Sequence, residues 1–267
     1  MTPASAALHN PLKVTAVMIT GKTPGHEKWA RAAARCFLEQ TYPAEQRELL
    51  IVNDGDYRIN GFEEHVDGTG RPLVREVRIP PGKHKLGDLR NTGIEESWGD
   101  YIIQWDDDDW HGPGRMVMQS EPLAADQART CTFLNRQLRY SFTLNSAKTF
   151  TTNRIHGTIM HRKCDIRYPS RGMMEDTDFM QKYITSCGLD SIVDIDVPRE
   201  QCDQLYIRFH HGDDENTWPA AHVMGLSSIM PGTWRIAPRA MVRLRRVLRD
   251  YYGLDANPGV APAKTGS

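Results

Sequence analysis

Apolar and polar positions along the first half of the chain alternate in the rhythm of strand, helix, strand. Residues 14–19 form a short apolar run that predicts a strand covered on both faces. The apolar residues of segment 29–40 recur at helical spacing, and Pro43 ends that segment. Residues 49–52 are again continuously apolar, which predicts a second buried strand.

The same rhythm continues to an acidic run. Residues 73–79 predict a weaker strand, 86–98 a helix, and 101–105 a strand that leads directly into Asp106–Asp109. This order predicts an α/β fold with a largely parallel sheet and right-handed crossovers. Ligands of such sheets bind beyond the carboxyl ends of the strands, where Asp54 and the acidic run both lie.

The second half is less regular. Its predicted helices cover residues 116–125, 179–187 and 238–252, and its predicted strands cover 130–134, 137–144 and 205–209. The strands 130–134 and 137–144 are candidates for pairing with each other.

The domain organisation follows from composition. We expect one domain over 13–234, a basic C-terminal helix over 235–254, and flexible ends at 1–12 and 255–267. The ends are rich in Ala, Pro, Gly, Ser and Thr, which cannot bury enough apolar surface to order themselves.

Length and charge narrow the class of protein. The chain has 267 residues, 39% of them hydrophobic, which suffices for one sizeable core. Its 33 Lys and Arg against 34 Asp and Glu create no global field that would favour nucleic acid. No apolar run approaches the roughly 20 residues of a membrane span, and residues 1–11 do not resemble a signal peptide. The five scattered cysteines fit buried, reduced thiols, so we expect a cytoplasmic protein.

The basic helix leaves two interpretations open. Six arginines between Arg235 and Arg249 could contact phosphate backbones, an anionic membrane surface or an acidic acceptor. The simpler interpretation is a solvated helix that packs through Met241, Leu244 and Leu248.

The acidic run carries the strongest chemical signal. Four adjacent carboxylates repel one another, and a run placed between an apolar strand and Trp110 should lie near the core. Packed carboxylates need a cation or protons, and Mg²⁺ or Mn²⁺ accepts such oxygens and shares them with phosphate. An EF-hand calcium loop is a poor alternative, because its sixth and twelfth positions would be His111 and Val117. We therefore expect a metal–diphosphate site.

Three further segments have both a structural and a functional interpretation. Glu175–Asp178 precedes a predicted helix, so an acid there is an N-cap or a general base. In Arg208–Gly212 a histidine pair follows a strand, and one imidazole could bind metal. Lys83–Asn91 places bases at a helix start, where they neutralise a diphosphate or simply face solvent.

Five short sequence motifs, which follow one another in the expected order, resemble those of a known family. They are Gln40–Pro43, Ile51–Asp56, Arg90–Ile94, Tyr101–Trp110 with its Asp-x-Asp segment, and Glu175–Phe179. Together they resemble glycosyltransferase family 2, whose catalytic domain has the GT-A fold, over roughly residues 14–218. The chain departs from the family at Thr20, where a Pro-Thr pair is usual, and at Asn53, where an Asp is usual.

The resemblance implies a donor site. Asp54 would contact the base or ribose, Arg90 and Lys85 the diphosphate, and Asp106 the ribose or the metal. The full set of donor-binding residues implied by the match is Thr20, Asp54, Lys85, Arg90, Asp106 and Asp107.

The resemblance also implies the catalytic groups. The metal ligands would be Asp106, Asp108 and His211, with His210 as the alternative histidine, and Mn²⁺ or Mg²⁺ as the ion. Asp176 would be the general base.

The resemblance therefore implies a metal-dependent, inverting glycosyltransferase that moves a sugar from a nucleotide-sugar donor to an acceptor hydroxyl; the inversion is implied by the family alone. A UDP-sugar is the family-level preference, and the acceptor is open among glycan, small molecule, protein and nucleic acid. The first alternative is a nucleotidyltransferase of related fold, for which Gly21–Gly25 is a faint phosphate-loop signal. The second is a non-catalytic module that binds sugar or nucleic acid.

Overall fold

A computed structural model describes residues 10–21, 25–82, 84–211, 233–234, 236–254 and 259–260, and the structural statements below concern these residues. The helices are α1 (Glu27–Leu38), α2 (Leu86–Glu96), α3 (Arg115–Ala125), α4 (Glu175–Cys187), α5 (Cys202–Leu205) and α7 (Pro238–Tyr252). Short 3-10 turns are η1 (Ala44–Gln46), η2 (His156–Thr158) and η3 (Leu189–Ser191).

The larger sheet has seven strands in the order β10-β6-β9-β4-β1-β2-β3. Its strands are β1 (Val14–Thr20), β2 (Arg47–Asn53), β3 (Val74–Arg78), β4 (Tyr101–Gln104), β6 (Cys131–Leu134), β9 (Met160–Arg162) and β10 (Ile192–Ile195). Neighbours pair in parallel except β9, which runs antiparallel to β4 and β6. The predicted mixed, mostly parallel α/β fold is thus confirmed.

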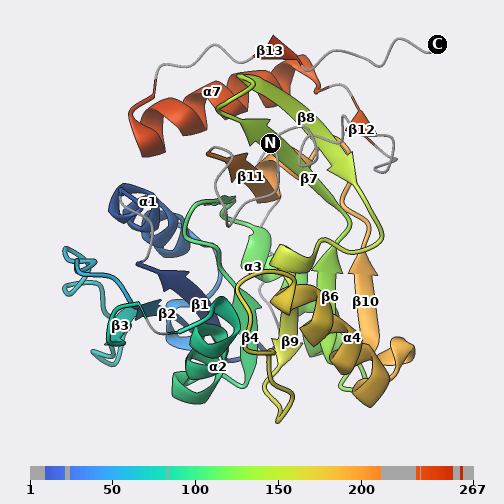
Figure 1. The fold of residues 1–267 in the computed structure, drawn as a ribbon. Coiled ribbons are helices and arrows are strands. Elements are labelled where there is room, and N and C mark those ends of the chain that lie inside the picture. Colours follow the sequence, from blue (N-terminus) through green and yellow to red (C-terminus); the bar gives the residue numbers. More distant parts are fainter. Residues whose placement is uncertain are drawn as a thin grey trace.

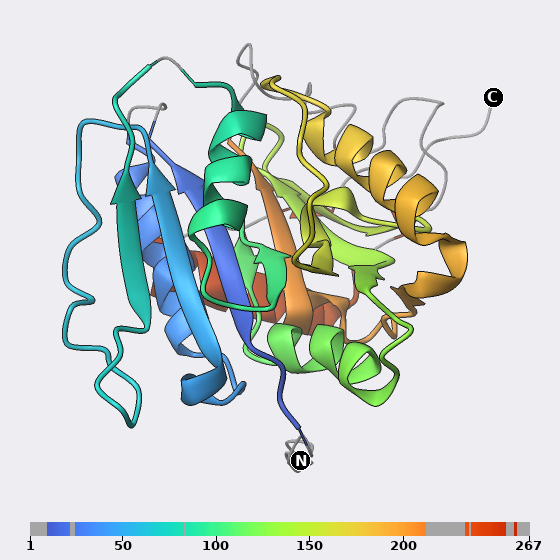
Figure 2. The same ribbon diagram turned by 90° about the horizontal axis from the view of Figure 1, so that it is seen from below.

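Helices cover both faces of this sheet, as the apolar strand sequences require. Alternate residues of β1 point to opposite faces, so Ala16 and Met18 pack with α1 while Val17 packs with α2. The side of α1 also holds α3 and α7, and the other side holds α2 and α4, as Figure 2 shows. This layering buries the strands and leaves the carboxyl ends of β1, β2 and β4 along one edge.

A second sheet lies above that edge in Figure 1 and runs β12-β8-β7-β11-β5, with β13 beside β8. Its strands are β5 (Trp110–His111), β7 (Arg136–Ser141), β8 (Ser146–Thr151), β11 (Tyr206–His210), β12 (Thr233–Trp234) and β13 (Gly259–Val260). β11 runs antiparallel to β5, which directly follows the acidic run. The second sheet therefore brings the histidine pair to the acidic run, although 100 residues lie between Asp109 and His210 in sequence.

The expected pairing of strands 130–134 and 137–144 is wrong. They correspond to β6 and β7, which belong to different sheets, and β7 pairs with β8 and β11 instead. One residue, Asn135, separates β6 from β7, and a hairpin connection usually needs at least two. The chain therefore continues past Asn135 and changes sheets.

The C-terminal helix forms over Pro238–Tyr252, as predicted, and Met241, Leu244 and Leu248 are buried against the core. The expected flexible ends fall mostly outside the described residues, but Gly259–Val260 of the second end pairs with β8.

No helix in the described part of the chain is long and apolar enough to cross a membrane. The expectation of buried thiols is confirmed for Cys36, Cys131 and Cys202, and wrong for Cys187, which is exposed.

Candidate active site

The acidic run forms the loop between β4 and β5, and a buried network fixes its first residue. The His111 ring stacks on Trp105 at a centroid distance of 3.9 Å, and its Nε2 donates to the backbone oxygen of Asp106 at 2.9 Å. Arg115, which is fully buried, donates to Nδ1 of the same ring and to the backbone oxygen of Gln104. Burial and the charge of Arg115 lower the pKa of His111, so the ring is neutral and holds the loop without adding charge.

Asp109 fixes the other end of the loop. Its carboxylate accepts hydrogen bonds from the Tyr206 hydroxyl and from the backbone N–H of Phe209, the latter at 2.9 Å. These bonds tie the loop to β11, and Asp109 is buried away from the cavity described next. The loop is therefore clamped to both sheets.

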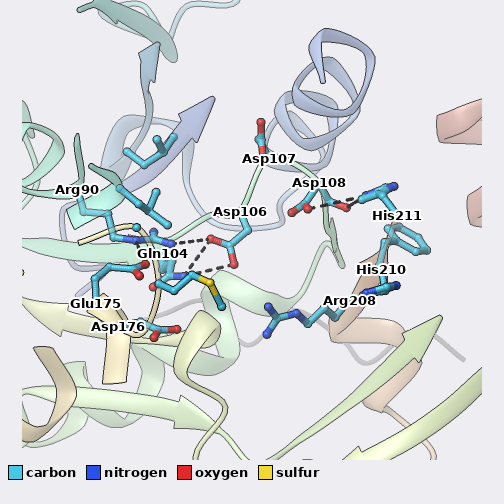
Figure 3. Close-up of a pocket in the computed structure, with 15 residues that line it drawn as sticks. Arg90, Gln104, Asp106, Asp107, Asp108, Glu175, Asp176, Arg208, His210 and His211 are labelled. Carbon is cyan, nitrogen blue, oxygen red and sulfur yellow. Dashed lines mark hydrogen bonds and ion pairs between the residues drawn. The ribbon is translucent and has the colours of Figure 1, made fainter. Parts of the chain in front are cut away.

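A cavity of about 250 Å³ opens where the two sheets meet (Figure 3). Of the residues predicted for the site, the cavity is lined by Arg90, Asp106, Asp107, Asp108, Asp176, His210 and His211. It is also lined by Ile19, Leu86, Gln104, Gly172, Met173, Glu175, Arg208 and Phe209. The structure thus brings together segments from α2, the acidic loop, the start of α4 and the end of β11.

Arg90 joins two of these segments. Its Nε donates to Glu175 at 3.0 Å and its Nη2 donates to Asp106 at 3.2 Å. Gln104 donates to the same oxygen of Asp106 at 2.9 Å. Gly157 of η2 lies so close that a Cβ there would approach Asp106 Oδ2 to 3.0 Å. The Asp106 carboxylate is therefore held in place, and two carboxylates already neutralise Arg90.

Asp108 and His211 face each other across the cavity mouth. The distance from His211 Nε2 to Asp108 Oδ2 is 3.8 Å, and to the Asp108 backbone oxygen it is 3.3 Å. Enclosure in the site and the charges of Asp109, Asp107 and Asp106 raise the pKa of Asp108 well above its ordinary value. Burial lowers the pKa of His211 to about 4, so its ring is neutral and can offer a lone pair.

This pair fits a divalent ion. A crowded carboxylate needs a cation or a proton, and a neutral imidazole beside it is a ligand that Mn²⁺ accepts. No three His, Cys, Asp or Glu side chains converge on one metal position among the described residues. An ion held by Asp108 and His211 would therefore take its remaining ligands from substrate or water.

The His211 ring rests on aromatic side chains. Trp29 of α1 lies at 4.0 Å between ring centroids, and Phe142 stacks on the histidine at 5.2 Å and 17°. Nearby, His26 Nδ1 lies 3.4 Å from Asp107 Oδ2. The start of α1 therefore supports both the histidine and the middle of the acidic loop.

Asp176 lies in the first turn of α4, whose N-cap residue is Met174. Asp176 is therefore not the N-cap residue of α4, and the capping interpretation is wrong. Its Oδ1 accepts a hydrogen bond from the backbone N–H of Thr177 at 2.7 Å, and the Thr177 hydroxyl contacts His156 Nδ1 at 2.9 Å. Asp178 instead pairs with Arg171 at 2.8 Å.

Three predicted donor residues lie outside the lining of this cavity. The Thr20 hydroxyl contacts the Tyr57 hydroxyl at 2.8 Å, and Asp54 is buried at the end of β2. Lys85 is an exposed residue that precedes α2. Thr20 and Asp54 lie at the carboxyl ends of neighbouring strands, where the backbone N–H of Asp54 donates to Thr20. The suggested phosphate loop, Gly21–Gly25, includes residues 22–24, which lie outside the described part of the chain.

Sequence reasoning missed Arg208, Gln104 and His26 and did not identify Glu175 as the partner of Arg90. The one sequence signal that could have identified Arg208 is its place in Arg208–Gly212, beside the histidine pair. The others depend on contacts between distant segments, which spacing along the chain does not reveal.

Comparison with solved structures shows the class of fold. Residues 1–349 of S. aureus TarS in complex with UDP-GlcNAc match with a TM-score of 0.57 and 11% identity, over 90% of this chain and 71% of that chain. A second crystal structure of TarS 1–349 matches with a TM-score of 0.52 and 14% identity, over 74% of this chain and 60% of that chain. Mannosyltransferase PcManGT from Pyrobaculum calidifontis, in complex with GDP-Man and Mn²⁺, reaches a TM-score of 0.49 at 13% identity, over 92% and 64%, a likeness too slight to support inference. The fold is therefore that of GT-A glycosyltransferases.

The sequence itself identifies the family. The profile described as Glycosyl transferase family 2 matches residues 21–165, more than half of the chain. The chain belongs to glycosyltransferase family 2. It spans about 60% of TarS 1–349 in the second of these structures, and a comparison with curated proteins found no match.

Proposed function

We propose that this chain is a metal-dependent, inverting glycosyltransferase that moves a sugar from a nucleotide-sugar, with a UDP-sugar as the first candidate, to an acceptor hydroxyl. One observation carries the proposal: in a member of family 2, Asp108, His211 and Asp176 line the same cavity. TarS, whose fold this chain shares, was solved with UDP and with UDP-GlcNAc, which supports a nucleotide-sugar as donor.

Asp108 and His211 would hold Mn²⁺ or Mg²⁺. When bound, the ion would offset the negative charge that grows on the departing diphosphate. Asp106 lies beside them, but its hydrogen bonds from Arg90 and Gln104 favour a role in shaping the site or in holding the ribose. Asp107 faces the cavity beside His26, where it would contact the donor.

Asp176 would accept the proton of the acceptor hydroxyl. As that oxygen forms its bond to the anomeric carbon, the bond from this carbon to the diphosphate oxygen breaks, and the electron pair leaves with the diphosphate. A single displacement of this kind inverts the anomeric carbon and needs no protein nucleophile. The bond from Thr177 N–H holds one carboxylate oxygen of Asp176 in place for this task.

Thr20 and Asp54 would bind the base or ribose at the carboxyl ends of β1 and β2. Lys85 and Arg90 were expected to hold the diphosphate. For Lys85 the diphosphate contact stays a prediction, and its exposed position before α2 is compatible with it. Arg90 is already bound to Asp106 and Glu175. The acceptor, and any contact of the basic helix with a membrane surface, stay predictions.

The decisive test compares Asp176→Asn with Asp178→Asn. The first should reduce turnover by about 10²–10⁴ while donor affinity and melting temperature change little, because a base acts in the transition state. The second removes a carboxylate that pairs with Arg171, and turnover should be retained. Unimpaired transfer by Asp176→Asn would refute the assignment of the base.

Metal dependence is tested by calorimetry with UDP and GDP, with and without Mn²⁺. We expect nucleotide and ion to bind cooperatively, and Asp108→Asn to weaken this cooperativity. Equal nucleotide affinity in EDTA would contradict the proposal. Mn²⁺-dependent hydrolysis of the donor without acceptor separates an enzyme from a binding module, which should show none.

A further inference from the structure

Arg208 is the second arginine of the cavity wall, and it differs from Arg90 in its contacts. It extends from β11 into the cavity, toward Asp106 and Asp176 (Figure 3). Arg90 makes ion pairs with two carboxylates at 3.0 and 3.2 Å. Within the described ranges, Arg208 makes no hydrogen bond or ion pair, so its guanidinium has donors to offer.

The surroundings keep this side chain charged. Burial lowers the pKa of Arg208, but Tyr206, Asp109, Asp106 and Asp108 outweigh it, so the pKa lies above its ordinary value. A guanidinium carries five N–H donors, and Arg208 is only half-buried, so water can reach these donors. Because no described group accepts from these donors, a ligand that enters the cavity can take the place of that water.

The planar shape of the Arg208 guanidinium narrows the chemical class of ligand that it can bind. The planar fork of arginine matches the paired oxygens of phosphate and carboxylate, and bidentate contacts of this kind are stronger than neutral hydrogen bonds. The fork lies in the same cavity as Asp108 on one side and Asp176 on the other. An oxyanion bound there would lie next to the carbon at which transfer occurs.

We propose that Arg208 is the oxyanion-binding residue of this site and directly contacts a phosphate or carboxylate of the donor. The inference rests on the proposed function, because it takes the donor to be a nucleotide-sugar. The oxyanion has two possible sources, the diphosphate itself or a carboxylate on the transferred sugar. The alternative is that Arg208 serves only as a counter-ion of the acidic loop.

The test measures affinities in the presence of Mn²⁺ for the wild type, Arg208→Gln and Arg208→Lys. The probes are uridine, UDP, UDP-glucose and UDP-glucuronic acid, or the guanosine counterparts if the wild type prefers GDP. Arg139→Gln is the matched control, because Arg139 is the register partner of Arg208 on β7 and does not line the cavity.

If the diphosphate is the ligand, Arg208→Gln should bind UDP about tenfold or more weakly while uridine is unchanged, a loss of about 1.4 kcal/mol. If a sugar carboxylate is the ligand, UDP should be unchanged and the preference for UDP-glucuronic acid over UDP-glucose should fall about tenfold or more. In either case Arg208→Lys should be impaired too, because it keeps the charge and loses the fork, and Arg139→Gln should bind as the wild type.

Two results would overturn the inference. One is unchanged affinity of Arg208→Gln for every probe, and the other is wild-type affinity of Arg208→Lys, which would show that charge alone suffices. If Arg208→Gln does not fold, as its melting curve would reveal, Arg208→Lys decides the question. Failure of the wild type to bind any of the nucleotides would instead contradict the proposed function.

Discussion

Replacing Arg90 by methionine should destabilise the protein in a pH-dependent way. Arg90 and Glu175 form a buried ion pair at 3.0 Å, with the two side chains 8% and 4% exposed. Arg90→Met keeps the length of the side chain and removes its charge. Asp106 keeps its hydrogen bond from Gln104, so the loss falls mainly on Glu175, which is left buried without a partner.

Removing one member of a buried pair typically costs about 3–5 kcal/mol, and we expect about 3 kcal/mol near neutral pH. The sign of the pH dependence follows from the surviving carboxyl. Burial raises the pKa of Glu175, and the charge of Arg90 lowers it, so this pKa should rise further in the variant. A carboxyl with a raised folded-state pKa favours the native state at low pH, and this contribution is lost as the pH rises through that pKa. Each additional unit by which the pKa of Glu175 rises lowers the free energy of unfolding above that pKa by about 1.4 kcal/mol.

Urea unfolding of Arg90→Met and the wild type at about pH 7.5 and about pH 5 measures the effect. The difference between the two proteins should be smaller at the lower pH. Adding Glu175→Gln to the variant should restore more than half of the loss at the higher pH, because no buried charge then remains. A loss that is equal at both pH values and is not restored by Glu175→Gln would refute the reasoning.

Three further predictions concern other parts of the site and the core. Asp109→Asn should lower the free energy of unfolding in urea by about 1–3 kcal/mol, since it disrupts the bond from Tyr206, with a smaller loss of Mn²⁺ affinity than Asp108→Asn shows. Thr177→Val should reduce turnover in a donor-hydrolysis assay and Thr177→Ser should retain it, because the Thr177 hydroxyl contacts Asp176 Oδ1 at 3.4 Å and His156 Nδ1 at 2.9 Å. Equal rates would contradict a positioning role of the hydroxyl. Cys187 should react with a maleimide in the native protein, as mass spectrometry would show. Cys36, whose pKa burial raises to about 12, should react only after unfolding.

The larger sheet could be predicted because its strands and helices carry local signals. Runs such as 49–52 and the helical spacing of 86–98 are visible in short windows, and the βαβ order then defines a parallel sheet. The second sheet could not be predicted in the same way. Its key pairing joins β11 to β5, nearly a hundred residues earlier, and short antiparallel strands can pair in many ways that look alike in sequence.

The acidic half of the site was predictable and its basic half was not. A carboxylate crowded among others at a strand end, such as Asp108, needs a cation or a proton, and the crowding is visible in the sequence. An arginine has many, and its role depends on which charges face it in the fold. Arg90, expected to serve the diphosphate, joins Asp106 to Glu175 in the structure, whereas Arg208 faces the cavity with its donors.

The clamping of the acidic loop explains how its residues divide their tasks. Asp106 is held by Arg90 at one end and Asp109 by the Tyr206 hydroxyl at the other. Because both ends are fixed, the middle carboxylates cannot swing away from one another, and their repulsion contributes to the raised pKa of Asp108. A bound cation would relieve that repulsion. The affinity for metal would then come from the two sheets that hold the loop closed, as much as from Asp108 and His211 themselves.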